Sequence, residues 1–362
     1  MKVRVITSIC ACLVVSGVCT LRGAIIIVDA GGAGDYTTIE EAISDSNTGD
    51  EIIVRQGTYY ETIDLGGKAI TLRSTNPYDP NVVVNTIIDG KSRGSTITCK
   101  SGEDANTIIE GFVITGGRSS YGGGMHCDGT SPTVNNCTFA DNTASSNGAG
   151  MYCADSNPTL TNCLFNGNDT ISGDGAGIYC LRSNPALANC TFIDNEATAQ
   201  LGDGGGMCCS DSSPTLNNCA FTDNWATRGG GISCGDSSPM LNNCTFTSNG
   251  AECECAAGAN TGGGMYCYNS SNPTLINCTF IDNKADNDAG AVYCDHGSRA
   301  ELAGTVICRN IPNEIVGSFT DNGDNIIGEF CPPVRLLGDL DGDRVVGFAD
   351  FAILADNWLK GD

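Results

Sequence analysis

The C-terminal segment carries the sharpest chemical signal in the sequence. Aspartates occupy positions 1, 3, 5 and 12 of a loop that begins at Asp339, and the residue at position 7 offers a backbone carbonyl. Calcium is a hard cation that needs several oxygen ligands, and this spacing wraps carboxylates around one ion. The sequence therefore predicts one calcium ion bound by Asp339, Asp341, Asp343, Val345 and Asp350.

The residues after this loop suggest a short helix, because Phe351, Leu354 and Trp358 fall on one helical face. Together, residues 338–362 resemble one half of a type I dockerin, an EF-hand-like calcium module that docks secreted enzymes onto cohesin-bearing scaffolds. Two departures from the dockerin pattern weigh against a cohesin-like partner: Arg344 replaces the glycine of position 6, and the second calcium loop is missing. An acidic turn without an ion is the alternative.

Candidate catalytic groups are sparse elsewhere. The histidines are His126 and His296, and His126 alternates with apolar residues, which predicts an outward, solvated position on a strand. The bases between residues 121 and 290 are Arg182, Arg228 and Lys284. No catalytic residue is assigned from the sequence.

Three acids recur at one position of a repeated pattern. Asp155, Asp211 and Asp236 each follow a cysteine by two residues. They would line one flank of the fold and hold calcium or a sugar chain, but solvated turn acids are the favoured interpretation.

These groups must be positioned by an internal repeat of roughly 28 residues. Each unit runs from a glycine cluster to a first cysteine, a Ser/Asn-Pro turn, a second cysteine and an Asn-terminated segment. The first cysteines are Cys127, Cys153, Cys180, Cys209, Cys234, Cys267 and Cys294, and the second are Cys137, Cys163, Cys190, Cys219, Cys244 and Cys278.

One unit is too rich in glycine and proline for a helical pair, and its apolar residues alternate as in short strands. In the first unit Met125, Cys127, Cys137 and Phe139 would face inward, and Asn136 would turn the chain in a left-handed conformation. We expect about three short strands per unit. Stacking of units would then form ladders of phenylalanine and asparagine.

The same frame extends upstream. Cys99 fits the first cysteine position, and Gly111 is assigned to the second. About eleven coils are expected between residues 50 and 331, with the ladder repeats over residues 99–310.

This pattern resembles a right-handed parallel β-helix of the pectin-lyase-like superfamily over residues 25–331, which makes the expected fold class all-β. Residues 34–43 resemble the N-terminal cap of that superfamily, so a cap helix is expected over residues 37–45. The glycine clusters with F-x-x-N also resemble the repeats of polymorphic outer-membrane adhesins.

The cysteines allow three interpretations. Mainly buried thiols are favoured because each ladder cysteine alternates with an inward apolar residue. Some disulfides are the alternative, with Cys253 and Cys255 as surface candidates. Zinc is disfavoured because no Cys-x-x-Cys pair with a matching partner pair occurs.

Composition limits the function classes. The chain has 362 residues, 48 glycines, 22 cysteines and a formal net charge of −24, which excludes nucleic acid as a partner. Residues 1–24 read as a secretory signal peptide, and no membrane span is expected after its cleavage. The protein is therefore expected to be secreted or at the cell surface, with residues 332–337 as a linker.

Two functions follow from these features. The resemblance implies an acidic-polysaccharide lyase or a related enzyme, but the motifs of polygalacturonases and the later catalytic blocks of pectinesterases are missing. We therefore expect a non-catalytic protein that binds extracellular polysaccharide or a surface component. A carbohydrate-active enzyme with a dockerin-like targeting segment is the alternative, and a base beside clustered acids would favour it.

Overall fold

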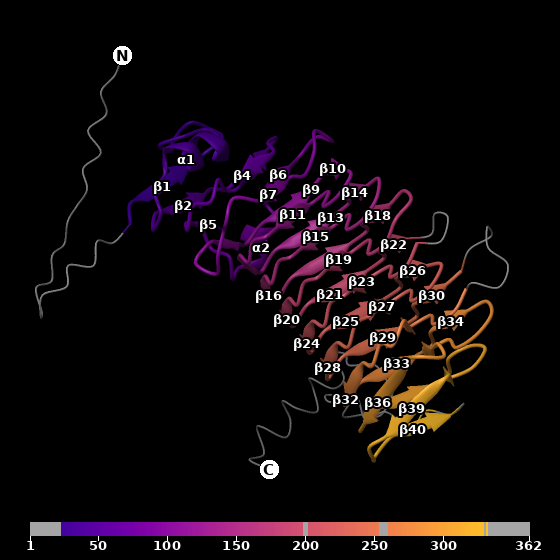
Figure 1. Ribbon diagram of the computed structural model, residues 1–362. Coiled ribbons are helices and arrows are strands. Elements are labelled where there is room, and N and C mark those ends of the chain that lie inside the picture. The colour runs from indigo at the N-terminus through magenta and orange to yellow at the C-terminus, as the bar shows by residue number, and fades with distance from the viewer. Residues whose placement is uncertain (1–22, 198–201, 253–259, 329–330, 332–362) are drawn as a thin grey trace, which may run out of the picture.

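The computed structural model describes residues 23–197, 202–252, 260–328 and 331, which wind into one parallel β-solenoid (Figure 1). The predicted calcium loop, the linker, Cys253 and Cys255, and all but the end of the predicted signal peptide lie outside these residues. No helix among the described residues is long and apolar enough to cross a membrane.

Four parallel sheets run along the solenoid, and each coil contributes one strand to each sheet that it reaches. Sheet A has 12 strands, sheet B has 11, sheet C has 10 and sheet D has 7. The architecture is therefore the expected all-β solenoid, with close to the expected number of coils.

The strands of sheet A, in spatial order, are β1 (Ile25–Val28), β2 (Glu51–Val54), β5 (Thr71–Ser74), β8 (Ile108–Glu110), β12 (Thr133–Asn135), β16 (Thr159–Thr161), β20 (Ala186–Ala188), β24 (Thr215–Asn217), β28 (Met240–Asn242), β32 (Thr274–Ile276), β36 (Arg299–Ala303) and β39 (Ser318–Asp321). Those of sheet B are β3 (Gly57–Tyr59), β6 (Thr86–Asp89), β9 (Val113–Thr115), β13 (Thr138–Ala140), β17 (Leu164–Asn166), β21 (Thr191–Ile193), β25 (Ala220–Thr222), β29 (Thr245–Thr247), β33 (Thr279–Ile281), β37 (Val306–Cys308) and β40 (Ile326–Gly328).

The strands of sheet C are β4 (Ile63–Asp64), β7 (Ile97–Cys99), β11 (Met125–Asp128), β15 (Met151–Ala154), β19 (Ile178–Leu181), β23 (Met207–Ser210), β27 (Ile232–Gly235), β31 (Met265–Tyr268), β35 (Val292–Cys294) and β38 (Ile315–Val316). Those of sheet D are β10 (Arg118–Ser119), β14 (Thr143–Ala144), β18 (Asp169–Thr170), β22 (Glu196–Ala197), β26 (Trp225–Ala226), β30 (Gly250–Ala251) and β34 (Lys284–Ala285). Sheet D adds a fourth strand to each central coil, where the sequence predicted three strands.

Helix α1 (Ile39–Asp45) covers the open N-terminal end of the solenoid (Figure 1). It begins two residues later than expected, because Thr38 is extended and its side chain accepts a hydrogen bond from the Glu41 backbone N–H at 3.4 Å. Ile39, Ala42 and Ile43 are buried in the core of the first coils. A second short helix, α2 (Pro80–Val83), lies between β5 and β6.

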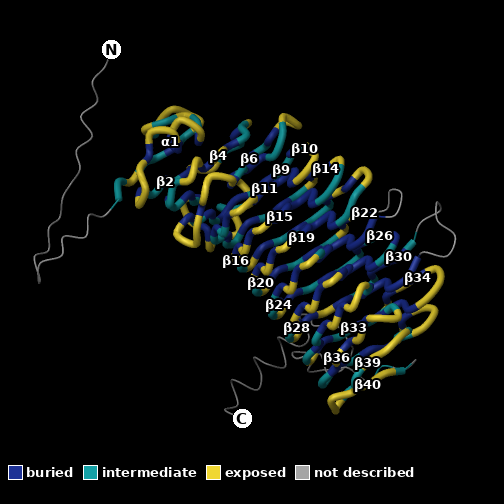
Figure 2. Tube along the Cα trace, viewed as in Figure 1, coloured by how far each residue is buried: buried dark blue, intermediate teal, exposed yellow. Residues whose placement is uncertain are grey.

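The interior is filled by columns of like side chains. Figure 2 shows that buried residues, in dark blue, recur in coil after coil along the solenoid. Phenylalanine rings of sheet B stack in parallel, with centroids 4.3 to 4.9 Å apart, from Phe139 to Phe280. The two cysteine columns lie in the same core, and 15 described cysteines are free and buried. Mainly buried thiols, the favoured interpretation, are therefore what the described residues show.

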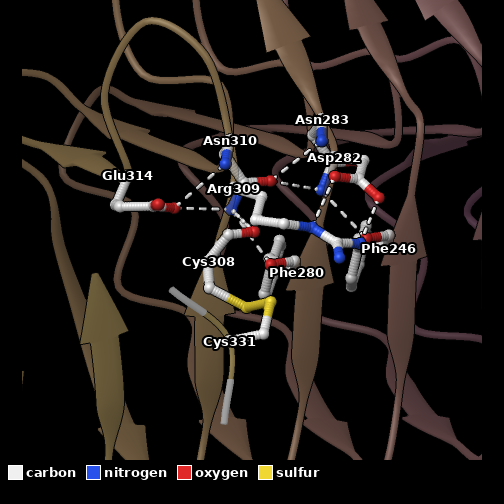
Figure 3. Close-up of polar contacts among 9 residues, drawn as sticks. All are labelled: Phe246, Phe280, Asp282, Asn283, Cys308, Arg309, Asn310, Glu314 and Cys331. Carbon is white, nitrogen blue, oxygen red and sulfur yellow. Dashed lines mark hydrogen bonds and ion pairs between the residues drawn. A yellow bond between two sulfur atoms is a disulfide. The ribbon is translucent and has the colours of Figure 1, made fainter. Parts of the chain in front are cut away.

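A buried asparagine ladder runs beside the phenylalanines. The Asn224 side-chain amide donates to the Phe192 carbonyl and to Asn249 Oδ1, each at 2.9 Å, and its own Oδ1 accepts from the Asn195 amide at 2.8 Å. The same pattern runs from Asn142 to Asn310, where Asn310 also meets Glu314 in the last coils (Figure 3). The ladder satisfies turn backbone groups that water cannot reach.

A buried serine ladder was missed by the sequence reasoning. The hydroxyl oxygen of each serine accepts the backbone N–H of the equivalent residue in the preceding coil, at 2.9 to 3.1 Å. The members are Ser156, Ser183, Ser212, Ser237, Ser271 and Ser298.

The register expected for the coil around Gly111 was wrong by one residue. Val113 pairs with Thr138 and Ile109 with Val134, so Phe112 occupies the second cysteine position. Gly111 instead matches Asn136, and both have positive φ, at 79° and 52°. The left-handed turn is therefore the feature that aligns these coils, and either glycine or asparagine serves it.

A disulfide between described residues lies in the last coil. Cys308 and Cys331, whose Cα atoms are 5.3 Å apart, tie the end of the described chain to β37 (Figure 3). Sequence reasoning left disulfides open and did not single out this pair.

We predict that Asn224→Ala lowers the free energy of unfolding by about 3 kcal/mol or more, because it leaves several buried polar groups without partners. Urea unfolding followed by circular dichroism measures the change. The matched control is Asn218→Gly in the exposed turn ladder, where glycine keeps the left-handed turn and we expect a loss below about 1 kcal/mol. Equal losses in the two variants would contradict a special role for the buried ladder.

Candidate functional site

The outer face of sheet C carries one unusual column of side chains. Strand residues alternate in direction, so the residue between two inward side chains points outward. Parallel pairing then places one such residue per coil in line with the next. The column consists of His126, Tyr152, Tyr179, Cys208, Ser233, Tyr266 and Tyr293.

The aromatic members contact one another along the solenoid axis. The Tyr152 and Tyr179 rings are parallel with centroids 5.6 Å apart, and Tyr266 contacts Tyr293 at 5.6 Å and Tyr268 at 5.3 Å. The exposed Tyr121 ring lies 4.9 Å from the Tyr152 ring. We call this set the aromatic strip; it comprises Tyr121, His126, Tyr152, Tyr179, Tyr266, Tyr268 and Tyr293.

The loops from sheet D to sheet C form a second column along one margin of the strip. Each member directly precedes a residue with positive φ, a glycine in all but the last coil. The backbone N–H after each member donates to the carbonyl of the next member, as from Gly175 to Asp203 at 2.8 Å and from Gly204 to Arg228 at 2.9 Å. This loop column contains Tyr121, Asn147, Asp174, Asp203, Arg228, Thr261 and Asp288.

The middle of the loop column brings two carboxylates and a guanidinium together. Arg228 donates from Nε and Nη2 to both oxygens of Asp203, at 2.7 and 2.9 Å. Asp174 accepts the backbone N–H of Asp203 at 2.8 Å. The guanidinium carbon of Arg228 lies 5.1 Å from the Tyr266 ring centroid, so the loop column and the strip meet here.

Burial changes the acid–base behaviour of this group. Burial raises the pKa of Asp203 to about 7, with Asp174 adding to the rise and Arg228 opposing it. Burial also raises the pKa of Asp174. Burial opposes the charge of Arg228, but Asp203 outweighs it and the pKa of Arg228 is raised, so the guanidinium stays protonated. A carboxyl whose pKa burial raises in this way is a candidate acid–base group.

Cys208 and Ser233 occupy the outward column between Tyr179 and Tyr266, and we call this non-aromatic stretch the floor of the strip. Both are buried, and the Ser233 hydroxyl has no hydrogen-bond partner among the described residues. Tyr268 lies across Gly235 of the preceding coil, where an added Cβ would come within 2.3 Å of the tyrosine ring. Glycine at 235 therefore allows Tyr268 to lean along the axis over this floor.

The expectation for His126 was wrong. It points outward as predicted, but it is only 9 % exposed, because the Tyr152 ring lies against it at 5.1 Å and Tyr121 at 6.4 Å. Burial and then Lys100 lower the pKa of His126 to about 4. An outward position on a strand is not solvated when the next coil places a large ring beside it.

The repeated acids line the opposite margin of the strip. Asp155, Asp211 and Asp236 have φ near 50° and directly follow the strands of sheet C. Asp155 forms a two-point ion pair with Arg182 at 2.7 and 2.8 Å, and Asp236 accepts from the Asn269 amide at 3.3 Å. Among the described residues no group of three or more His, Cys, Asp or Glu side chains is arranged to hold a metal ion.

Sequence reasoning named Arg228 but missed Asp174, Asp203 and the tyrosines. A usable signal existed, since the loop column is the residue before each glycine cluster and the strip is the residue before each first cysteine. The predicted calcium ligands, Asp339, Asp341, Asp343, Val345 and Asp350, lie outside the described residues. Lys284 contacts Glu252 at 3.4 Å, and His296 is exposed.

We predict that His126→Phe reduces the loss of stability in acid. The folded-state pKa of about 4 lies below the value of 6.5 for a free histidine, so the unfolded chain binds the proton first. The contribution of neutral His126 is full above about pH 6.5 and is lost as pH falls toward 4. The fall in unfolding free energy from about pH 7 to pH 4 should shrink by about 2 kcal/mol.

Urea unfolding at several pH values measures this difference. Tyr152→Phe is the control, since it changes the same strip without removing a group that titrates in this range. Asp203 contributes the opposite slope in both proteins and cancels in the comparison. Parallel pH profiles for the His126→Phe variant and the unaltered protein would refute the assignment.

Comparisons with known proteins agree with this architecture. The sequence matches the family described as "Right handed beta helix region" over residues 23–213 and 202–325. A stretch of 142 residues is 33 % identical to a protein named cell surface glycoprotein from Methanothermus fervidus, and it covers 39 % of this chain and 21 % of that protein. The match thus spans about a fifth of the relative's length.

Solved structures with similar folds have low sequence identity. Pectate lyase Pel9A aligns over 83 % of this chain and 79 % of its own, with 15 % identity and a TM-score of 0.49. An alginate lyase from Paenibacillus aligns over 80 % and 96 %, with 13 % identity and a TM-score of 0.48. A carrot pectin methylesterase aligns over 86 % and 89 %, with 12 % identity and a TM-score of 0.40. The family match extends over most of the described coils, and this chain belongs to the right-handed β-helix family.

Proposed function

We propose that this protein acts outside the cell or on its surface as a non-catalytic β-helix that binds polysaccharide along the aromatic strip. The observation that carries the proposal is the strip itself: aromatic side chains lie in parallel register on one outer face, in two runs of neighbouring coils that Cys208 and Ser233 separate. A ligand that repeats along the same axis would meet equivalent rings within each run.

A polysaccharide has the right repeat for this face. Neighbouring coils are about 4.8 Å apart, a length similar to one sugar unit of an extended chain. Tyrosine combines an apolar ring with a hydroxyl, which suits the mixed apolar and hydroxylated surface of a sugar, and the stacked Tyr152 and Tyr179 are each 9 % exposed, so they offer a ligand a narrow contact surface. The Ser210 hydroxyl, which is hydrogen-bonded to Tyr179, and the loop column add polar groups along the margins.

Two further observations support a surface location. The first residues have the basic start and apolar run of a signal peptide. The relative from Methanothermus fervidus is named as a cell surface glycoprotein, and its matched stretch is 33 % identical to this chain.

A carbohydrate-active enzyme is the second candidate, and Asp203 favours it. A carboxyl group with a pKa near 7, next to the half-buried carboxyl of Asp174, fits the needs of a general acid or base. Arg228 lies beside these acids, the arrangement that would favour an enzyme, but its ion pair with Asp203 and its raised pKa make it a poor proton acceptor. We therefore rank binding above turnover.

We also propose that the C-terminal segment binds one calcium ion through Asp339, Asp341, Asp343, the Val345 carbonyl and Asp350. The support is the spacing of oxygen ligands in the sequence. Docking to a cohesin-like scaffold is a further proposal for the same segment, and the missing second loop copy weighs against it.

We predict that Tyr152→Ala and Tyr266→Ala each weaken polysaccharide binding at least about tenfold, since each removes a ring that contacts at least two neighbours on the strip. Retention on a panel of immobilised plant, algal and bacterial polysaccharides measures the effect. Tyr78→Ala is the matched control, because Tyr78 is 76 % exposed and lies in the loop between β5 and α2.

The same panel separates the two candidate functions. Binding without release of products, lost in the strip variants and kept in the Tyr78 variant, supports the binding protein. Turnover of any polysaccharide that Asp203→Asn abolishes would establish the enzyme instead.

For the C-terminal loop we predict uptake of one calcium ion per chain by titration calorimetry of the full protein, and loss of that uptake in the double variant Asp341→Asn, Asp343→Asn. Asp324→Asn, which removes an exposed acid elsewhere, is the control. Absence of calcium uptake in the unaltered protein would refute the proposal.

A further inference from the structure

We propose that the aromatic strip selects glycans that lack acidic groups and binds amine-bearing sugars most tightly; this inference rests on the polysaccharide-binding function proposed above. The charges on the two margins of the strip, and the cations already engaged there, carry the inference.

Both margins are acidic. The turn margin carries Asp155, Asp211, Asp236 and Asp295, each directly after or close behind a strand of sheet C. The loop margin carries Asp174, Asp203 and Asp288. These acids act on the strip itself: Asp155 raises the pKa of the Tyr152 hydroxyl, and Asp203 and Asp295 raise that of Tyr266, although burial is the largest cause in both.

The cations that act on the strip are mostly neutralised. Arg182 is held by Asp155 at 2.7 and 2.8 Å, and Arg228 by Asp203 at 2.7 and 2.9 Å. Within the described residues, the remaining cation that perturbs a strip side chain is Lys100, beside His126 at one end. The same ion pairs neutralise Asp155 and Asp203, so among the described residues the uncompensated charge beside the strip comes from acids such as Asp211, Asp236 and Asp288. A sugar carboxylate placed along the strip would face these acids, while both arginines are already engaged.

The middle of the strip also contains a buried hydroxyl, that of Ser233, with no hydrogen-bond partner among the described residues. Ser233 lies in register between Cys208 and Tyr266 on the outward side of sheet C, is fully buried, and its hydroxyl makes no hydrogen bond within the described structure. A hydroxyl or ammonium group of a ligand inserted beside Tyr268 would supply that partner. The orphan hydroxyl is an observation independent of the acidic margins.

The charges beside the strip act differently on acidic, neutral and amine-bearing glycans. A polyuronate brings one negative charge per sugar and is repelled by both margins. A neutral glycan keeps the hydrogen bonds without the repulsion. A protonated amino sugar gains ion pairs with the turn acids and attraction to tyrosine rings, as Arg228 already does with Tyr266.

The test compares three oligosaccharides of equal length by titration calorimetry with the full protein in low-salt buffer at neutral pH. The probes are oligomers of glucosamine, of N-acetylglucosamine and of galacturonic acid, which carry positive, zero and negative charge. We expect affinity to fall in that order. Added salt should weaken the glucosamine oligomer most and leave the N-acetylglucosamine oligomer nearly unchanged.

Variants identify the margin as the cause. The double variant Asp211→Asn, Asp236→Asn removes two negative charges and places asparagine, which tolerates positive φ, at both turns. It should lower glucosamine-oligomer affinity by about three- to tenfold and leave the affinity for the neutral oligomer unchanged. Asp324→Asn is the control, since Asp324 also has positive φ and lies in the last coil of the described solenoid.

The outcomes separate this inference from the function on which it rests. Equal or tighter binding of the galacturonate oligomer, abolished by Tyr152→Ala, would overturn the charge preference and leave polysaccharide binding in place. No binding of any of the three oligomers, nor of any polymer in the panel above, would overturn both.

Discussion

In-register stacking of identical coils is the constraint on which the rest of this structure depends. Parallel pairing places each residue over its equivalent in the next coil, so any buried polar group must find its partner along the axis. The asparagine ladder meets this demand: Asn224 bonds to Asn195 and Asn249 and also to the Phe192 carbonyl. The serine ladder does the same with backbone N–H groups. The interior therefore tolerates little change at these positions.

The same constraint acts on the surface. A residue that repeats once per unit becomes a column whether it faces inward or outward, so tyrosines before the first cysteines become a strip and the residues before the glycine clusters become a margin. The central coils depart from the repeat at Cys208, Ser233 and Arg228. That departure gives the middle of the strip a half-buried ion pair and a hydroxyl without a hydrogen-bond partner among the described residues.

Much of this arrangement could be predicted from residue types and spacing. The phenylalanine stack, the buried cysteines and the left-handed asparagine turns follow from alternation and period. Gly111 was assigned one residue out of place because its unit has phenylalanine where the others have cysteine. His126 was expected in solvent because spacing gives direction but not what lies beside the side chain. The Cys308–Cys331 pair joins positions that the period does not relate.

The sequence by itself determined the solenoid, its cap and the order of its inner columns, because these depend on which residue types recur at which spacing. It also defined an acidic calcium loop and a leader segment as predictions. Only the tertiary structure decided which outward residues are buried, which acids hold a guanidinium and where a hydroxyl lacks a partner. The reason is physical: Asp174, Asp203 and Arg228 lie in three successive coils, and their burial and charge coupling arise only when those coils are stacked.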